Sequence, residues 1–305
     1  MSRYVLNRLL LSIPTILGVA TISFLLMRLI PGDPARVIAG VDGTIEDIER
    51  IRAKLGLDQP VLTQYLRFIG NLLMGDLGTS ARSGGPVTSA IAETAPRTLQ
   101  LAILTLIVSV PVGCGLGVLA AVRRGRVMDI LSSIIAVIGV SMPVYWIGLL
   151  LVIVFAVNLQ ILPVAGNRSF WSFVLPVATL SLYSIGFIAR QTRSAMLEVL
   201  RQDYVRTARA KGAGALRVIM FHAFRNALLP IITIIGIQFG NLLGGAILTE
   251  VVFAWPGLGR LLVDSITARD FAVVQGTVFV IAVALVLLNL LIDLAYAAVD
   301  PRITL

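Results

Sequence analysis

The chain has 305 residues, of which 57% are hydrophobic and 13% charged, and its formal net charge is +9. Soluble globular domains contain about a quarter charged residues, so this composition excludes an ordinary soluble fold. The 25 Lys and Arg against 16 Asp and Glu also exclude an acidic disordered chain. A basic excess suits either a membrane protein or a nucleic-acid-binding protein, and the positions of the charges decide between these classes.

Six stretches of the chain contain no Asp, Glu, Lys or Arg, the residues that are most costly at the centre of a bilayer. About 20 apolar residues cross the hydrocarbon core, and the shortest of the six stretches has 19 residues. The stretches are residues 9–27, 98–122, 130–167, 169–189, 226–249 and 271–292. We therefore predict an all-α, polytopic membrane protein with six spanning helices.

The longest stretch decides between six spans and seven. Its 38 residues could hold two helices, but its tail, residues 158–167, is polar and rich in turn-forming residues. We expect one helix near residues 131–156 followed by a loop, and seven spans remain the alternative.

The first stretch follows Arg3 and Arg8, as the apolar part of a secretory signal peptide would. It is longer than that part usually is, and Pro31-Gly-Asp-Pro34 follows it without a small-residue cleavage pattern. We expect a retained first helix. The predicted organisation is an N-terminal tail and first span in residues 1–30, an external helical segment in residues 31–97, and a core with the other five spans in residues 98–305.

Basic residues in the short connections predict the orientation. With the N-terminus inside, 14 Lys and Arg face the cytoplasm, and the short external loops hold only Arg168, Arg260 and Arg269. This asymmetry is typical of membrane proteins. Both termini are then cytoplasmic, and because the net charge is an orientation signal, nucleic-acid binding loses its main support.

The external segment is predicted to form two short helices. Thr44 and Asp47 have the spacing of a capping box, apolar residues then recur near helical period, and Gly56 ends the helix. The second helix begins after Pro60 and ends near Met74. Such short helices bury little core of their own, so we expect them to rest on the outer ends of the spans. They form either a structural cap, which we favour, or a docking surface for an external partner.

The fourth and fifth stretches are joined by residues 190–225, far more than a hairpin between spans needs. This loop holds eight basic residues against Glu198 and Asp203. A short helix is expected over residues 216–224, with Pro230 in the first turn of the next span.

The first part of this loop has the apolar period of a helix. Met196, Leu200 and Tyr204 recur at every fourth position, so we predict one helix from residue 194 to residue 211 that ends at Gly212. Such a helix could lie on anionic lipid or in a groove of a partner protein. These residues alone leave both alternatives open.

Motifs along the whole chain follow one another in a recognisable order. Two of them lie in the loop, Arg206-Thr-Ala-Arg-Ala-Lys-Gly212 and His222-Ala-Phe-Arg-Asn-Ala-Leu-Leu-Pro230. The others are Arg8-Leu-Leu with Pro14, Pro31-Gly-Asp-Pro34, Leu55-Gly-Leu-Asp58-x-Pro60 with Gln64-Tyr65, Gly75-Asp-Leu-Gly78-x-Ser80, Phe253-x-Trp-Pro-Gly-Leu-Gly259, Arg269-Asp270 and Asp300-Pro-Arg302. Together they resemble the permease subunits of ABC importers for dipeptides and oligopeptides, which have the type I permease fold.

The resemblance departs from the broader permease pattern at two points. The Glu that opens the general coupling motif is Arg206 here, and the Leu-Pro pair falls later, at Leu229-Pro230. Both features resemble the peptide-permease subgroup. By resemblance, the loop helix docks into a cleft of an ATPase, and Gly212 supplies a left-handed turn. The residues implied in this coupling are Tyr204, Arg206, Thr207, Ala208, Arg209, Lys211 and Gly212.

The resemblance also implies the partners. They are a second homologous permease, two ATP-binding subunits and an external substrate-binding protein, in a bacterial inner membrane. A P-loop needs Gly-Lys followed by Ser or Thr, whereas the two lysines, Lys54 and Lys211, precede Leu and Gly. We therefore expect no bound cofactor, with ATP and magnesium on the partner ATPases. Peptides are the expected substrate, and glutathione, nickel chelates and oligosaccharides are alternatives.

Small residues recur at every fourth position in two of the predicted spans. One pair is Gly113 and Gly117, which flanks the lone Cys114 and lets helices approach closely. The other is Gly236, Gly240 and Gly244. Packing within the chain accounts for at least one of these stripes, and we assign the second to the seam with the other permease or to the translocation path. Cys114 is expected to be a small packing residue.

Two other classes of protein are alternatives, a membrane enzyme and a homo-oligomeric channel. A membrane enzyme would gather titratable residues inside the bilayer, but the one histidine, His222, lies in the loop, and Asp293 is the sole acid well inside the last span. We predict no catalytic or metal site and expect Asp293 to face the bundle interior. A homo-oligomeric channel would show a selectivity filter. No filter motif is present, and this alternative stays open.

Overall fold

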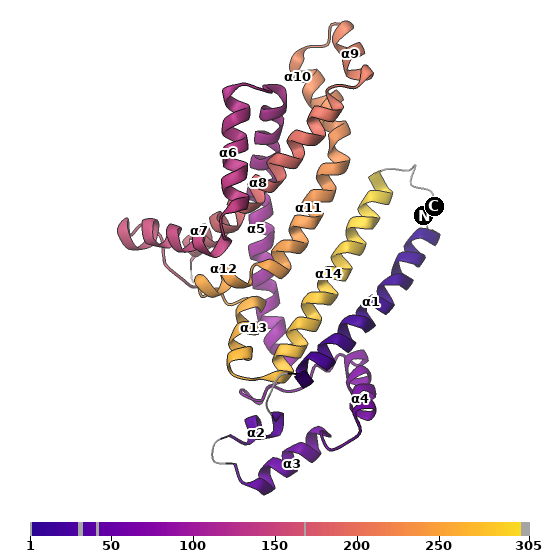
Figure 1. The fold of residues 1–305 in the computed structure, drawn as a ribbon, viewed down its shortest axis with the longest axis vertical. Coiled ribbons are helices and arrows are strands. Elements are labelled where there is room, and N and C mark those ends of the chain that lie inside the picture. Colours follow the sequence, from indigo (N-terminus) through magenta and orange to yellow (C-terminus); the bar gives the residue numbers. More distant parts are fainter. Residues whose placement is uncertain (1, 30–32, 41–42, 168, 300–305) are drawn as a thin grey trace. The chain divides into compact units, whose positions relative to one another are not determined.

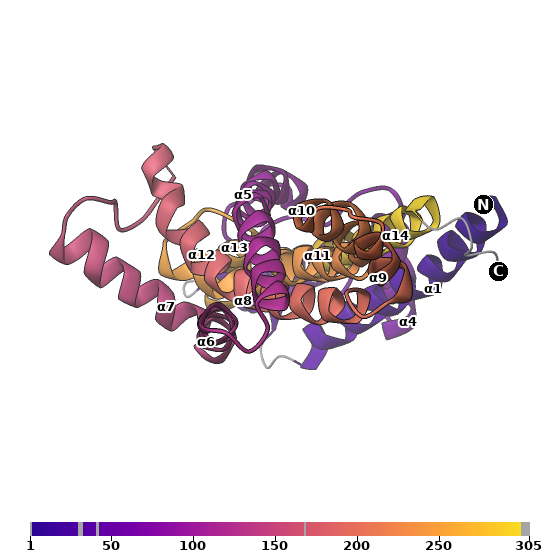
Figure 2. The same cartoon turned by 90° about the horizontal axis from the view of Figure 1, so that it is seen from above.

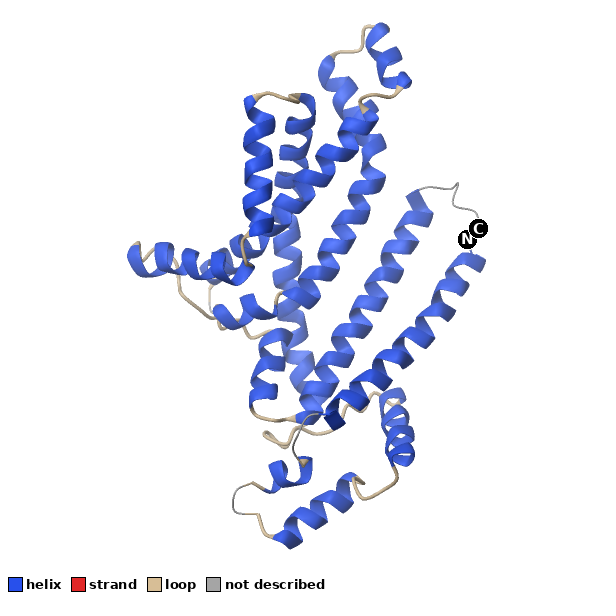
Figure 3. Cartoon of the chain, viewed as in Figure 1, coloured by secondary structure: helices blue, strands red, loops and turns tan. Residues whose placement is uncertain are grey.

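The structure, a computed structural model, describes residues 2–29, 33–40, 43–167 and 169–299. The regular elements within these residues are helices (Figure 3), and an isolated bridge joins Thr79 and Pro86. The all-α prediction is therefore confirmed. The chain forms two compact units: the first lies within Met1–Thr98 and Pro256–Leu290, and the second within Leu99–Trp255 and Leu291–Thr304. The predicted division into an external segment and a core follows the sides of the membrane, and it stays a prediction.

The first unit combines the N-terminal third of the chain with a segment near its C-terminus (Figure 1). Its helices are α1 (Ser2–Leu29), α2 (Pro34–Ala39), α3 (Ile45–Leu55), α4 (Val61–Leu73), the start of α5 (Val87–Val122), α13 (Leu258–Thr267) and most of α14 (Phe271–Val299).

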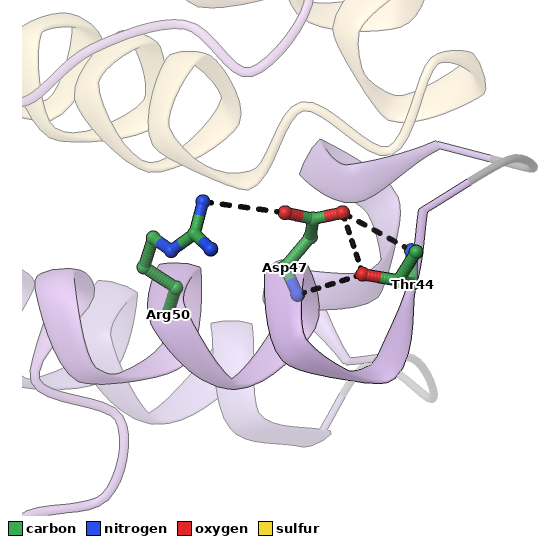
Figure 4. A network of polar contacts seen from close by, with 3 residues as sticks. All are labelled: Thr44, Asp47 and Arg50. Atoms are coloured by element: carbon green, nitrogen blue, oxygen red, sulfur yellow. Dashed lines mark hydrogen bonds and ion pairs between the residues drawn. The ribbon is translucent and has the colours of Figure 1, made fainter.

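Helix α3 begins at the predicted capping box (Figure 4). The Thr44 Oγ1 accepts a hydrogen bond from the Asp47 amide at 3.2 Å, and the Asp47 carboxylate accepts one from the Thr44 amide at 3.3 Å. Arg50 Nη1 lies 3.4 Å from the other Asp47 oxygen. The helix ends at Gly56, whose φ of 67° is left-handed, so both predicted ends of α3 are confirmed.

The second short helix, α4, packs against α1, which is the first predicted span. Phe24 of α1 packs edge-on against Tyr65, with ring centroids 5.3 Å apart, and stacks on Phe68 at 5.6 Å. The hydroxyls of Thr21 and Tyr65 are 2.8 Å apart. The sequence analysis missed α2, although Asp33 before Pro34 is a typical helix start: the Asp33 carboxylate caps the Ala35 amide at 3.0 Å.

Asp270 ties the loop before α5 to the start of α14. Its buried carboxylate accepts hydrogen bonds from the Ser80 hydroxyl and from the backbone amides of Ala81 and Arg82 at 3.2 and 3.3 Å. Nearby, Val87 and Val273 belong to one apolar cluster. A buried carboxylate with several donors is well satisfied, which gives the Arg269-Asp270 motif a structural role in this unit.

The second unit is built around α8. Its elements are the rest of α5, α6 (Val127–Ser141), α7 (Val144–Leu151), η1 (Val152–Asn158), η2 (Phe170–Phe173), α8 (Val174–Val199), α9 (Asp203–Ala210), α10 (Ala215–Arg217), η3 (Val218–Phe224), α11 (Arg225–Gly245), α12 (Ile247–Val252) and the end of α14. Helices α6, α7 and α11 pack against α8. Its fully buried Ile188 and Met196 share an apolar cluster with Cys114, Ala223 and Ile231.

Helices α5 and α8 approach closely at the first glycine pair. A Cβ atom at Gly113 would lie 2.8 Å from Ile188 Cβ, and one at Gly117 would lie 2.6 Å from the Ala189 carbonyl oxygen. Cys114 is buried beside them, with the Thr192 hydroxyl 3.8 Å from its sulfur. The expected packing role of these small residues is thus confirmed within the chain.

The prediction of one uninterrupted helix over residues 131–156 is wrong. Helix α6 ends at Ser141, and Val127–Ser141 and Val144–Asn158 meet at a bend of 101° (Figure 2). Pro143 follows the break at Met142, and a proline restricts the preceding residue to extended conformations. The loop expected after residue 158 is present.

The apolar helices coincide with the predicted stretches. Four are long and apolar enough to cross a membrane: Val87–Val122, Phe170–Val199, Ala215–Gly244 and Phe271–Ile292. The bent pair makes up to five, and Leu9–Leu25 of α1 is a shorter apolar helix. Six spans, and cytoplasmic termini, stay predictions.

Candidate functional site

The predicted helix over residues 194–211 is two helices. Helix α8 continues to Val199, a turn follows, and α9 begins at Asp203. Met196 is fully buried on α8, while 44% of Tyr204 is exposed on α9, so the predicted shared apolar face of Met196, Leu200 and Tyr204 is wrong. The spacing of four continues through the sequence. The turn at residues 200–202 separates α8 from α9, so residues with this spacing no longer lie on one face.

Helix α9 holds the predicted coupling residues together at one end of the second unit (Figure 1). Its C-terminal turn is a Schellman motif, because the Gly212 amide donates to the Arg209 carbonyl oxygen at 3.0 Å and the Ala213 amide donates to that of Ala208 at 3.2 Å. Gly212 has a φ of 80°, a conformation that costs other residues about 1–2 kcal/mol. The predicted left-handed turn is confirmed.

One buried residue holds α9 in place, and the sequence analysis did not predict it. Val205 is fully buried, and α9 packs against η3. Desolvation raises the pKa of the Tyr204 hydroxyl above its ordinary value of 10.0, so it stays a neutral donor. An apolar residue between Tyr204 and Arg206 was the available signal, but the spacing of Met196, Leu200 and Tyr204 predicted a different buried face.

The basic side chains around α9 are exposed. The segment carries a single acid, Asp203, and five basic residues, Arg201, Arg206, Arg209, Lys211 and Arg217. Among the described residues, no ion pair or side-chain hydrogen bond involves these five. The helix is thus a positively charged surface without an ion-pair partner in the part of the chain that the structure describes.

The helix expected over residues 216–224 is not separate. Residues 215–245 are helical without interruption, through α10, the π-helical turn η3 and α11. Pro230 therefore lies inside a helix, and its predicted place in a first turn is wrong. Because this helix is continuous, η3, against which α9 packs, leads directly into the long apolar helix α11.

An ion pair that was not predicted joins α6 to α8. Arg193 Nε and Nη2 donate to the two oxygens of Asp129 at 2.6 and 2.9 Å, and the Gly125 amide adds a bond of 2.9 Å. The Asp129 side chain is 8% exposed and that of Arg193 30%. The bidentate geometry fixes the α5–α6 turn to α8. The sequence feature that could have predicted this ion pair is Asp129, a single acid directly before a charge-free stretch.

The second glycine stripe lies on α11, apart from α9. A Cβ atom at Gly236 would lie 2.5 Å from Ile292 Cδ1 of α14, so this position packs within the chain. Gly240 and Gly244 are half-buried. Their assignment to a seam or translocation path stays a prediction.

Two predictions concern residues at the limits of the description. The Asp293 side chain and the terminal Asp300-Pro-Arg302 lie outside the described residues. Within the residues that are described, no group of three His, Cys, Asp or Glu could hold a metal ion. The predicted lack of a catalytic or metal site stays a prediction.

Solved structures share the fold of this chain. The fold matches an amino acid ABC transporter at a TM-score of 0.57 and 17% identity, over 69% of this chain and 94% of that chain. It matches the MetNI methionine ABC transporter in an inward-facing conformation at 0.54 and 21% identity, over 69% and 96%. The fold is that of ABC importer permeases, all-α and polytopic.

Sequence comparisons place the chain within this class. Residues 113–305 match the family described as the binding-protein-dependent transport system inner membrane component, and residues 1–102 match the N-terminal family of the same membrane component. The chain belongs to this family and is a multi-pass permease subunit of the bacterial inner membrane. It is 46% identical over 303 residues to a glutathione transport system permease protein of Salmonella paratyphi A, and 46% identical over 311 residues to a Brucella suis protein named for a peptide transport system permease, each over 99% of both chains.

Proposed function

We propose that the chain forms, with a second homologous permease, the path by which peptides enter the cell. Two partner ATPases supply the energy, and an external binding protein delivers the substrate. The observation that carries this proposal is α9, an exposed basic helix that ends at a rigid left-handed turn. Its charges have no partner among the described residues, which suits a surface that is completed by another protein.

The connection between α9 and α11 suggests how the ATPase acts. Val205 anchors α9 on η3, and η3 continues into α11. A displacement of α9 would therefore move α11 as a rigid lever, without bending an intervening loop. Tyr204, Arg206, Thr207, Ala208, Arg209 and Lys211 are the proposed contacts with the ATPase.

The chain is proposed to bind no cofactor itself, with ATP and magnesium held by the partners. Neither Lys54 nor Lys211 lies in a P-loop sequence. The co-purification of ATPase chains and a second permease with the tagged chain tests the assembly. A stable homo-oligomer without those subunits would instead favour the channel alternative.

Peptides are the proposed substrate, and glutathione, itself a small peptide, is the second candidate. The names of the relatives at 46% identity support both. The experiment is a deletion strain that carries either the chain or an empty vector, with uptake of radiolabelled dialanine and glutathione measured separately. Uptake of one solute that returns only with the chain identifies the substrate. If neither returns while the assembled transporter is present, the peptide proposal fails and a nickel chelate or oligosaccharide should be tested.

A further inference from the structure

A basic groove lies beside α9 in the second unit. Its volume is about 460 Å³, and it lies among the end of α5, the end of α8, α9 and the start of the 215–245 helix. Three arginines line it: Arg124 of the α5–α6 turn, Arg201 of the turn before α9, and Arg209 of α9 itself. Apolar side chains, among them Val122, Leu197 and Ile219, form the rest of the lining.

Two of the three guanidinium groups, those of Arg201 and Arg209, have no carboxylate partner within the described residues, and Asp129 acts on Arg124 only through Coulombic attraction. The lining contains no carboxylate, and within the described residues no ion pair or side-chain hydrogen bond engages Arg124, Arg201 or Arg209. The buried carboxylate closest in sequence, Asp129, is engaged by Arg193 and the Gly125 amide. Like charges around one cavity repel each other unless an anion lies between them.

The chemistry of the groove selects the kind of anion. Guanidinium groups bind phosphate oxygens through paired N–H donors, and an apolar lining suits hydrocarbon. Val122 is the last residue of a charge-free stretch, so the groove lies where an apolar span meets the aqueous phase. Basic pockets between spans at this level are suited to the head groups of anionic lipids.

We propose that this groove binds a phosphate group, either that of an anionic phospholipid, which the apolar lining favours, or free inorganic phosphate. The site is independent of the transported substrate. It adds a ligand at the base of α9, where an occupant would contact Arg209 of α9 and Arg201 of the preceding turn together.

Lipid retention by the purified transporter complex tests the proposal. Native mass spectrometry would compare dioleoylphosphatidylglycerol with dioleoylphosphatidylcholine on the wild type and on an Arg124→Gln/Arg201→Gln variant. The matched control is Arg126→Gln/Arg217→Gln, which removes two exposed charges that do not line the groove. We expect the wild type to prefer phosphatidylglycerol and the groove variant, which lacks two arginines, to bind it about thirtyfold more weakly, since each basic residue contributes about 1 kcal/mol near an anionic lipid surface. The control should bind as the wild type.

A second arm separates the two sources of phosphate. Phosphatidylglycerol that is retained in millimolar inorganic phosphate assigns the lipid. Displacement of the lipid, together with arginine-dependent binding of radiolabelled phosphate, assigns the free anion. An Arg124→Lys/Arg201→Lys variant, which keeps the charge, guards against a folding defect and should retain more ligand than the Gln variant. Equal binding by the groove and control variants in both arms would overturn the proposal.

Discussion

Two parts of the chain extend beyond the apolar helices: α2–α4 and the segment around α9. They differ in whether their charged side chains form ion pairs. In the first, Arg52 pairs with Asp33, and Asp47 is engaged by Thr44 and Arg50. In the second, five basic residues have no ion pair within the described chain. Surface ion pairs contribute little to stability, so the comparison is informative about partners: the first segment holds two ion pairs, whereas the basic residues around α9 have none among the described residues.

The backbone does not explain this difference. Both α3 and α9 end in a left-handed glycine, Gly56 or Gly212, with the same pair of Schellman hydrogen bonds. The contrast therefore lies in the side chains that each helix displays. The following predictions test whether it reflects function.

The largest effect is expected at Gly212. Proline fixes φ near −65° and removes the amide that donates to Arg209, at a cost of about 3 kcal/mol or more. Gly212→Pro should reach the membrane in normal amounts but reduce uptake of the labelled substrate to background. The control is Gly214→Ala, at a glycine with a φ of −60°, which should transport normally. Normal uptake by Gly212→Pro would remove the coupling role of this turn.

The next effect concerns the ion pair of Asp129 and Arg193 in the second unit. Asp129→Asn should lower the unfolding free energy by about 2 kcal/mol, because it leaves a half-buried Arg193 without its carboxylate. Thermal unfolding of the purified complex measures this loss. The double variant Asp129→Asn/Arg193→Gln should lose less than the sum of its single variants, and strict additivity would show that the pair is not coupled.

A smaller effect is expected in α3. Thr44→Ala removes the capping box and should destabilise α3 by about 1 kcal/mol, which hydrogen exchange of the amides in residues 45–55 would detect. Thr63→Ala on α4 is the matched control, since the exposed Thr63 hydroxyl makes no hydrogen bond within the described residues. Unchanged protection of α3 in Thr44→Ala would show that packing, and not the cap, holds this helix.

The smallest effect depends on pH. The Arg52 guanidinium holds the pKa of Asp33 below its ordinary value of 3.8. A lowered folded-state pKa means that the stabilisation is complete above pH 3.8 and is lost as the pH falls through the folded value. Exchange protection of α2, which Asp33 caps, should therefore fall below pH 3.8 by a few tenths of a kcal/mol, given the exposure of the pair. Asp33→Asn should lack this step, and a step that persists in it would assign the titration to another group.

Local signals predicted the parts of the fold that depend on local interactions. The charge-free stretches marked the apolar helices, and Thr44, Gly56, Pro60 and Gly212 marked helix ends, because caps and left-handed turns act within a few residues. Helical period failed in the basic loop, because Met196 and Tyr204 keep a spacing of eight whether one helix or two connect them. The break between the two helices was decided by the burial of Met196 inside the second unit and of Val205, on α9 itself.

The sequence by itself determined the class of this protein, its apolar helices and the basic character of α9, since hydrophobicity and charge are properties of composition and order. Only the tertiary structure decided which groups meet. It brought Asp129 to Arg193 across 64 positions, joined η3 to α11, and gathered Arg124, Arg201 and Arg209 around one groove. These contacts depend on how helices distant in the sequence pack, and a linear pattern does not contain that geometry.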